Sequence, residues 1–171
     1  MSTPPQIYVA CLAAYNNGKL HGAWIDANQE PSAIFAEVHA MLALSPEAGA
    51  EEWAIHDFEG FCGVKLSEWE GFENVSALAS FIAEHEVFGG ALLSHFCGDL
   101  EQACSAIAED YCGQYKSLAD FAEEMTSETE TIPEALRYYI DYEAMARDME
   151  LNGDVFMIET GFEAVHVFWQ R

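Results

Sequence analysis

The sequence predicts an α+β fold made of three small modules. Three observations support this prediction: strand-like segments lie near both ends, helical periodicity dominates the middle, and turn residues separate these segments. Of the 171 residues, 51% are hydrophobic and 13% aromatic, which exceeds the apolar content of disordered acidic chains. We therefore expect a folded protein whose charge lies on its surface.

The first module, residues 1–62, is predicted to be a small sheet with one helix. Residues 6–14 and 20–27 are expected to pair as a hairpin around an Asn-Asn-Gly turn. Pro31 suits the first turn of a helix, and residues 53–58 have the composition of a third strand. The helical periodicity depends on Ile34, Val38, Met41 and Leu42.

The second module, residues 63–104, is predicted to be a cluster of short helices. Apolar residues keep helical spacing from Val75 to Phe88, and Gly89-Gly90 is expected to break the helix before residues 91–96. Gly98-Asp99 then provides a break and an N-cap for a helix that runs through Ala108.

The third module, residues 105–171, is predicted to be a sheet with helices. A strand at 111–116 precedes Ser117, which is expected to cap a helix with an apolar face. That face consists of Leu118, Phe121, Ala122 and Met125. Pro133 is expected to begin a further helix that continues to Leu151 and ends at Asn152-Gly153. Residues 155–159 and 164–169 are predicted to form a terminal hairpin around Gly161.

Charge is the strongest feature of the composition. The chain has 30 Asp plus Glu and 6 Lys plus Arg, so its formal net charge is −24. Such a surface repels nucleic acid and anionic membranes and attracts basic grooves, including those that hold DNA. Because no signal-peptide pattern or membrane-length apolar run occurs, a cytoplasmic location is expected.

The carboxylates recur in the pattern acid-x-acid. On a helix, residues two apart point in nearly opposite directions, so such a pair cannot clamp one metal ion. Seven pairs have this form: Asp57/Glu59, Glu68/Glu70, Glu84/Glu86, Asp99/Glu101, Glu128/Glu130, Asp141/Glu143 and Asp148/Glu150. Between residues 139 and 151 this pattern predicts a helix that is buried on two sides and exposes ridges of acid. A solvated helix face or adaptation to high salt would also give acidic helices, but the large apolar residues and the excess of Glu over Asp argue against salt adaptation.

The sequence gives little support for an enzyme. His85, Glu86, His95 and Cys97 lack the spacing of metal ligands, and the glycines match neither dinucleotide-binding nor P-loop patterns. Cys97 and Cys112 lie near His or Asp, but surrounding acid raises the pKa of a thiol and disfavours the reactive thiolate. The five cysteines are an odd set without a C-x-x-C, so free and mostly buried thiols are expected. We expect no catalytic residue, metal or cofactor.

Three long strings carry a family resemblance. IYVACLAAYNNGKLHGAWIDA (7–27), LLSHFCGDLEQA (92–103) and YYIDYEAMARDMELNG (138–153) are similar to stretches of ArdA antirestriction proteins. The resemblance spans nearly the whole chain in the same order. It implies an elongated homodimer joined through residues 105–171, encoded on mobile genetic elements. It also implies inhibition of type I restriction-modification enzymes by mimicry of DNA, through their methyltransferase and specificity subunits.

The candidate binding surface consists of acids in the second and third modules. They are Glu84, Glu86, Asp99, Glu101, Glu109, Asp110, Asp120, Glu123, Glu124, Asp141, Glu143, Asp148 and Glu150. The alternative is an acidic adaptor or chaperone for another basic DNA-binding protein.

Overall fold

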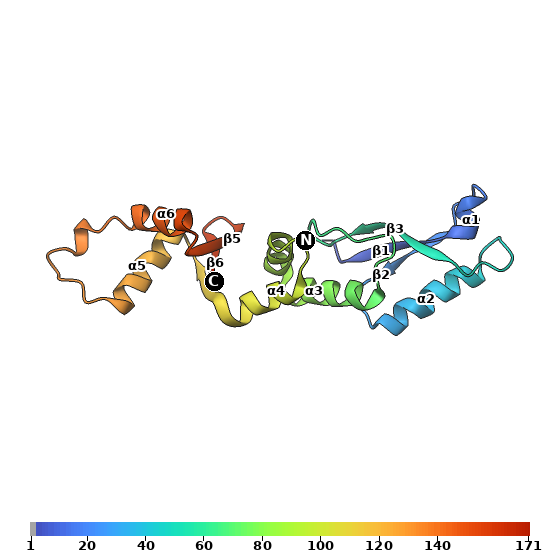
Figure 1. Ribbon diagram of the computed structural model, residues 1–171, viewed down its shortest axis with the longest axis horizontal. Coiled ribbons are helices and arrows are strands. Elements are labelled where there is room, and N and C mark those ends of the chain that lie inside the picture. Colours follow the sequence, from blue (N-terminus) through green and yellow to red (C-terminus); the bar gives the residue numbers. More distant parts are fainter. Residues whose placement is uncertain (1–2) are drawn as a thin grey trace. The chain divides into compact units, whose positions relative to one another are not determined.

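The computed structural model describes residues 3–171 and contains two small antiparallel sheets with helices, so the predicted α+β class is confirmed (Figure 1). The chain divides into two compact units: the N-terminal unit contains the described residues up to Leu100, and the C-terminal unit is Glu101–Arg171. The finer division into three modules stays a prediction. Within residues 3–171, no helix combines the length and apolarity needed to cross a membrane.

The N-terminal sheet has the strand order β2-β1-β3, with all strands antiparallel. Its strands are β1 (Gln6–Cys11), β2 (Gly22–Asp26) and β3 (Trp53–Glu59). The predicted pairing of the first two strands is confirmed, since Ile7 lies opposite Ile25. The predicted strand extent of 6–14 is wrong, because the chain forms a short helix, α1 (Leu12–Asn16), directly after β1.

The Asn-Gly signal marks the end of α1 rather than a two-residue hairpin turn. Gly18 has a φ of 72° and its N–H donates to the Tyr15 carbonyl at 2.9 Å. This left-handed conformation is the one that glycine commonly adopts just beyond a helix. The alanines of the LAAYN segment favour a helix, so the same residues fit a helix end better than a β-turn.

One face of this sheet is covered by α2 (Pro31–Ala43) (Figure 1). Pro31 occupies its first turn, as predicted, where its missing N–H costs nothing. The four residues that defined the helical pattern, Ile34, Val38, Met41 and Leu42, are all buried. The helix contacts β1 and β2, and Ile7, Val9 and Cys11 of β1 are fully buried.

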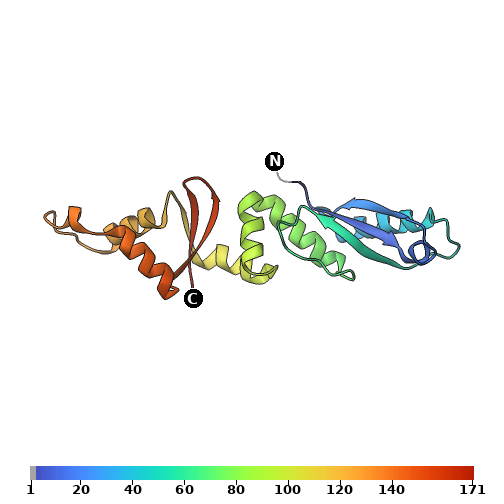
Figure 2. The ribbon, with the colours of Figure 1, turned by 90° about the horizontal axis from the view of Figure 1, so that it is seen from above.

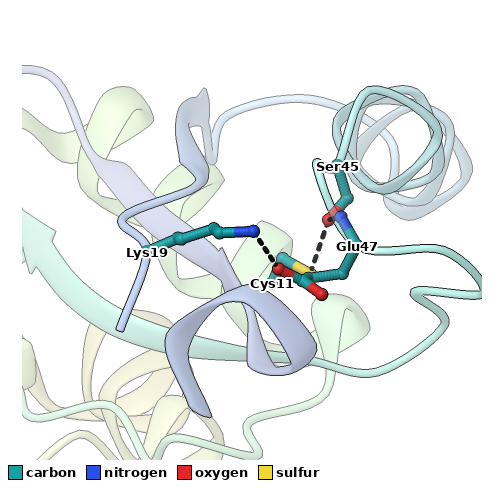
Figure 3. A network of polar contacts seen from close by, with 4 residues as sticks. All are labelled: Cys11, Lys19, Ser45 and Glu47. Carbon is teal, nitrogen blue, oxygen red and sulfur yellow. Dashed lines mark hydrogen bonds and ion pairs between the residues drawn. The ribbon is translucent and has the colours of Figure 1, made fainter. Parts of the chain in front are cut away.

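A small polar network fastens the connections at one end of the N-terminal unit (Figure 3). Lys19 Nζ lies 2.6 Å from Glu47 Oε1, which joins the loop after α1 to the loop after α2. Beside it, Cys11 Sγ lies 3.4 Å from Ser45 Oγ. The hydrogen bond from Lys19 is the main cause that lowers the pKa of Glu47 below its ordinary value.

The helix α3 (Phe72–His95) is kinked at Glu86, where the backbone has φ 51° and ψ −134°. The predicted break at Gly89-Gly90 is therefore wrong, since both glycines lie buried in the helical segment after the kink. A Cβ on Gly90 would collide with the Cys62 side chain, and a Cβ on Gly89 would lie 2.6 Å from His85 Cβ. These glycines allow close packing, which local helix propensity cannot reveal.

The boundary between the two units falls after the first residue of α4 (Leu100–Ser105), and this helix directly follows Gly98-Asp99 as predicted. It continues as a π-helical turn, η1 (Ala106–Asp110), two residues beyond the predicted end. The sheet order is β4-β6-β5, with β4 (Tyr111–Tyr115), β5 (Val155–Gly161) and β6 (Ala164–Trp169). The predicted terminal hairpin of β5 and β6 is confirmed (Figure 2).

Two helices, α5 (Leu118–Thr129) and α6 (Tyr142–Asn152), pack against each other and complete this unit. Ser117 caps α5 as predicted, because its Oγ accepts a hydrogen bond from Asp120 N at 3.2 Å. Gly153 ends α6 in the left-handed conformation, also as predicted. The core formed by both helices and the sheet contains Leu118, Phe121, Ala122, Ala146, Met149, Val155, Val165 and Val167.

The helix expected from Pro133 onward is wrong in its first part. Residues 131–141 form a connection that contains only one 3-10 turn, η2 (Arg137–Tyr139), and α6 begins at Tyr142. Asp141 caps α6, since its Oδ1 accepts from Ala144 N at 2.9 Å. The cap satisfies an N–H that a longer helix would have bonded internally, so it fixes the start of α6.

Candidate functional site

The thirteen candidate acids are largely available to a partner. Twelve of them are exposed, and Asp110 is partly buried. Asp110 Oδ1 lies 3.2 Å from Arg171 Nε, so this carboxylate is paired within the chain. Three candidates belong to the N-terminal unit, namely Glu84, Glu86 and Asp99, and the other ten belong to the C-terminal unit. The carboxylates of the C-terminal unit are therefore the larger part of the candidate surface.

The outward face of α5 is acidic along its whole length. Asp120, Glu124 and Glu128 recur every four residues, and Glu123 lies beside them, while the helix contains no Lys or Arg. Like charges at this spacing destabilise a helix by roughly 0.2–0.5 kcal/mol per pair. The apolar face predicted from the sequence is confirmed by the burial of Leu118, Phe121 and Ala122 and by the packing of Met125 against the core. Packing holds α5 in place despite the repulsion on its exposed side.

The acidic face of α5 influences a neighbouring phenol. Burial first, and then the negative charge of Glu124, raise the pKa of Tyr115 above its ordinary value of 10.0. A negative neighbour disfavours the phenolate, so the direction agrees with a dense field of carboxylates at this place.

The helix α6 exposes four carboxylates: Asp141 at its cap, then Glu143, Asp148 and Glu150. Ala146 and Met149 are buried, and Tyr142 and Met145 pack against the core, so the predicted inward arc is confirmed. The predicted burial on a second side is wrong, because Leu151 is 75% exposed. Within the C-terminal unit the other helix, α5, and the sheet approach α6 from one side, which leaves the second arc uncovered.

Two of the acids also stabilise the helices that carry them. Asp141 supplies the N-cap of α6, and Asp120 lies in the first turn of α5, where its Oδ2 accepts from Ser117 Oγ at 2.5 Å. A carboxylate at a helix N-terminus interacts favourably with the helix dipole. Any test of the acidic surface must therefore separate the charge of these two residues from their structural role.

A groove lies between the start of α5 and the connection that leads into α6. Its volume is about 610 Å³. Its lining includes four of the candidate carboxylates, Asp120, Glu123, Asp141 and Glu143, and no Lys or Arg. Tyr138 and Tyr139 also line it, with 89% and 84% of their surfaces exposed. The sequence did not predict their position beside a groove, because a helix was expected from Pro133 onward in place of the connection that presents them.

The structural observations give no support to a metal or thiolate enzyme. In the described part of the chain, no group of three or more His, Cys, Asp or Glu side chains is arranged to hold a metal ion. Burial is the main cause that raises the pKa of Cys112, which disfavours its thiolate. The expectation of mostly buried thiols is wrong, since Cys11 is buried, Cys112 is partly buried, and the remaining three are exposed. Cys62 and Cys97 occupy turns with positive φ, so they cannot enter a core strand or helix.

Comparison with known families gives one clear result. A family model described as antirestriction protein (ArdA) matches residues 7–164, which is nearly the entire chain. A comparison with curated proteins gives no match. Because the family match covers far more than half of the sequence, the chain belongs to the ArdA antirestriction family, whose function is to counteract restriction-modification enzymes.

Proposed function

We propose that this antirestriction protein is a DNA mimic that inhibits type I restriction-modification enzymes by occupying their DNA-binding groove. The outward face of α5 and α6 carries the proposal, because exposed carboxylates recur along both helices and Arg147 is the single cation within them. Basic grooves gain affinity for DNA from phosphate contacts and counterion release, and carboxylates at similar density can replace the phosphates. No residue needs to perform chemistry in this mechanism.

The amount of charge is sufficient for this role. Duplex DNA carries about one charge per 1.7 Å of its axis. Two copies of a chain with net charge −24 would match the charge of about 80 Å of duplex. A homodimer therefore carries enough charge to replace a long stretch of duplex in a DNA-binding groove.

The proposal includes a homodimer that forms through residues 105–171 and acts in the cytoplasm, where restriction enzymes meet their DNA. Leu151 and Phe162 support this contact, since they are apolar and are 75% and 94% exposed. Burial of such side chains against a second copy would be favourable. Sedimentation of the full chain at micromolar concentration should give a dimer, and L151D combined with F162D should shift it to monomer.

The direct test is competition with a fluorescent DNA duplex for a purified type I methyltransferase. The protein should displace the duplex, and its own affinity for the methyltransferase, measured directly, should fall steeply as salt rises, because the release of counterions contributes less free energy at high salt. In cells, expression of the protein should raise phage plating on a restricting host and leave plating on a non-restricting host unchanged. Failure to displace the duplex at low salt would refute the mimic mechanism.

The adaptor alternative makes a different prediction in a pull-down. A DNA mimic should capture restriction-modification subunits from a lysate of a restricting host. An acidic adaptor should capture nucleoid or repair proteins equally well from a host that lacks those subunits.

A further inference from the structure

We propose that the groove between α5 and α6 binds arginine side chains of the partner enzyme, with Tyr138 and Tyr139 as stacking surfaces. The inference rests on the proposed function and deepens it, since it identifies one place on the acidic surface where binding depends on more than charge. We call this place the tyrosine groove, and its lining residues are Ser117, Ala119, Asp120, Glu123, Tyr138, Tyr139, Ile140, Asp141, Tyr142 and Glu143.

The two tyrosines are unusually exposed for aromatic side chains. Burial of large aromatic side chains is favourable. Tyr138 and Tyr139 are nevertheless among the most exposed side chains in the described chain, at 89% and 84%. Tyrosine is enriched at the energetic centres of protein interfaces. Adjacent exposed tyrosines beside a groove therefore point to a partner, independently of the acid around them.

The connection between α5 and α6 presents these side chains in a defined conformation. Leu136 N donates to the Pro133 carbonyl and Tyr139 N donates to the Leu136 carbonyl, each at 2.9 Å. These bonds close two successive turns just before the α6 cap (Figure 1). A preordered turn lowers the entropy that would be lost when the tyrosines bind. Tyr142, which packs against the core, anchors the end of the same segment.

The charge of the groove selects the chemistry of the partner. Four carboxylates and no cation line the groove, so a positively charged group is required. Arginine satisfies both features, because its planar guanidinium stacks on aromatic rings and pairs with carboxylates through two parallel hydrogen bonds. Lysine offers only a compact charge. DNA-binding grooves carry both residues to contact phosphates, so the partner provides suitable side chains.

A second copy of this chain is a poorer occupant. In a two-fold symmetric dimer both copies contribute the same patch, so the carboxylates of one groove would approach a surface that is equally rich in acid. A neighbouring groove is a poorer candidate for binding arginine. It shares Glu123 and Tyr142 with the tyrosine groove, but its lining includes Arg137, so it is less suited to a cation.

The test uses a change that leaves charge untouched. Replacing Tyr138→Ala and Tyr139→Ala together keeps the net charge at −24, so mimicry by charge alone predicts no effect. We expect about tenfold weaker competition with duplex DNA for the methyltransferase, because each lost cation–π contact is modest. The slope of affinity against salt should stay the same, since no charge is removed. Tyr138→Phe with Tyr139→Phe should retain most affinity, because the rings remain.

Trp69 provides the matched control. It is 66% exposed and lies between Glu68 and Glu70, but it is not part of the tyrosine groove. W69A should bind like the unsubstituted protein. Equal weakening by W69A and by the tyrosine pair would overturn the proposal, and so would an unchanged affinity of the double alanine variant. Conversion of that variant to a monomer would instead assign the groove to the dimer contact and would also overturn it.

A direct probe separates this proposal from the proposed function. A short arginine peptide should shift the NMR signals of Tyr138 and Tyr139 more strongly than a lysine peptide of equal length. If the arginine peptide binds there while the full protein fails to compete for the methyltransferase, the groove chemistry stands and the mimic mechanism fails. If competition succeeds and the two peptides behave alike, the mimic mechanism stands and the arginine groove fails.

Discussion

The helices α2 and α5 perform the same structural task in the two units, but their outward faces differ. Each buries apolar residues against a three-stranded antiparallel sheet. The 13 residues of α2 include one acid, Glu37, whereas the 12 residues of α5 include Asp120, Glu123, Glu124 and Glu128. Because α2 covers its sheet without a row of acid, covering a sheet does not require one. The carboxylates of α5 repel one another, so a role in binding explains them better than a role in folding.

The largest effect is expected when the exposed acids of α5 and α6 are neutralised, which removes the difference in surface charge between the two units. Six exposed acids of α5 and α6 that are not helix caps are replaced by their amides: Glu123, Glu124, Glu128, Glu143, Asp148 and Glu150. At about 0.5 kcal/mol for each exposed pair, competition for the methyltransferase should weaken by about 100-fold. The salt dependence should become shallower, because fewer cations of the enzyme are paired. Any single one of these substitutions should leave most inhibition intact.

The matched control neutralises six exposed acids of the N-terminal unit that are outside the candidate surface. They are Glu30, Glu37, Glu51, Glu52, Glu59 and Glu68. Both variants lose the same formal charge, so a comparison between them tests position rather than total charge. Equal weakening by the two sets would show that net charge alone drives binding and would remove the special role of α5 and α6.

A smaller effect concerns stability and separates capping from mimicry. D141A removes the acceptor for Ala144 N and should lower the free energy of unfolding by about 1 kcal/mol, measured by denaturant titration. D141N keeps a good capping residue and should retain most of that stability while it removes one charge. Glu143, which is exposed in the first turn of the same helix, gives the comparison, since E143Q changes the charge and leaves the cap intact. Equal destabilisation by D141A and D141N would contradict a capping role.

The sequence predicted the parts of the fold that depend on local patterns. The apolar face of α2, the Ser117 cap, the Gly153 end of α6 and the terminal hairpin are each determined by residues close together in the chain. The break in α3 was misplaced because a Cβ on Gly90 would collide with the side chain of Cys62, which is distant in the sequence. Such tertiary constraints leave no periodic signal.

The sequence predicted that acids of the candidate surface are exposed, but it did not predict the groove beside them. Acid spacing predicted the exposed ridges of α6, since residues at a fixed spacing in the sequence point in fixed directions on a helix. The tyrosine groove was not predicted, because it depends on where α6 begins and therefore on the competition between Asp141 as a cap and Pro133 as a helix start. An Asp three residues before Ala144 was the available signal, as Asp at such a position is a common N-cap.

A further prediction tests how much the acidic faces weaken folding. Added salt screens repulsion between exposed charges, so the thermal midpoint should rise between low and moderate ionic strength. The variant with six amides on α5 and α6 should start from a higher midpoint and respond less to salt, because part of the repulsion is gone. A midpoint that is flat or falls with salt in the unsubstituted protein would contradict dense surface repulsion.

The smallest expected effect contrasts the central strands of the two sheets. The central strand β1 is buried through Ile7, Val9 and Cys11, whereas β6 buries His166, which forms a 2.8 Å hydrogen bond with Tyr111 Oη. Burial lowers the pKa of His166 below its ordinary value of 6.5. The unfolded chain therefore takes up this proton first as pH falls, so the free energy of unfolding should decrease from pH 6.5 down to the folded pKa.

Chemical denaturation of the unsubstituted protein and of H166Q at several pH values would measure this contribution. The difference between the two curves isolates His166, because the carboxylates titrate in the same way in both proteins. H166Q should lose the pH dependence in that window, whereas H39Q, a change at an exposed histidine of α2, should follow the unsubstituted protein. If H166Q and the unsubstituted protein have parallel curves, the buried histidine contributes nothing to the pH dependence. The C-terminal sheet would then resemble the N-terminal sheet, whose apolar central strand β1 is expected to add no pH dependence to stability in this range.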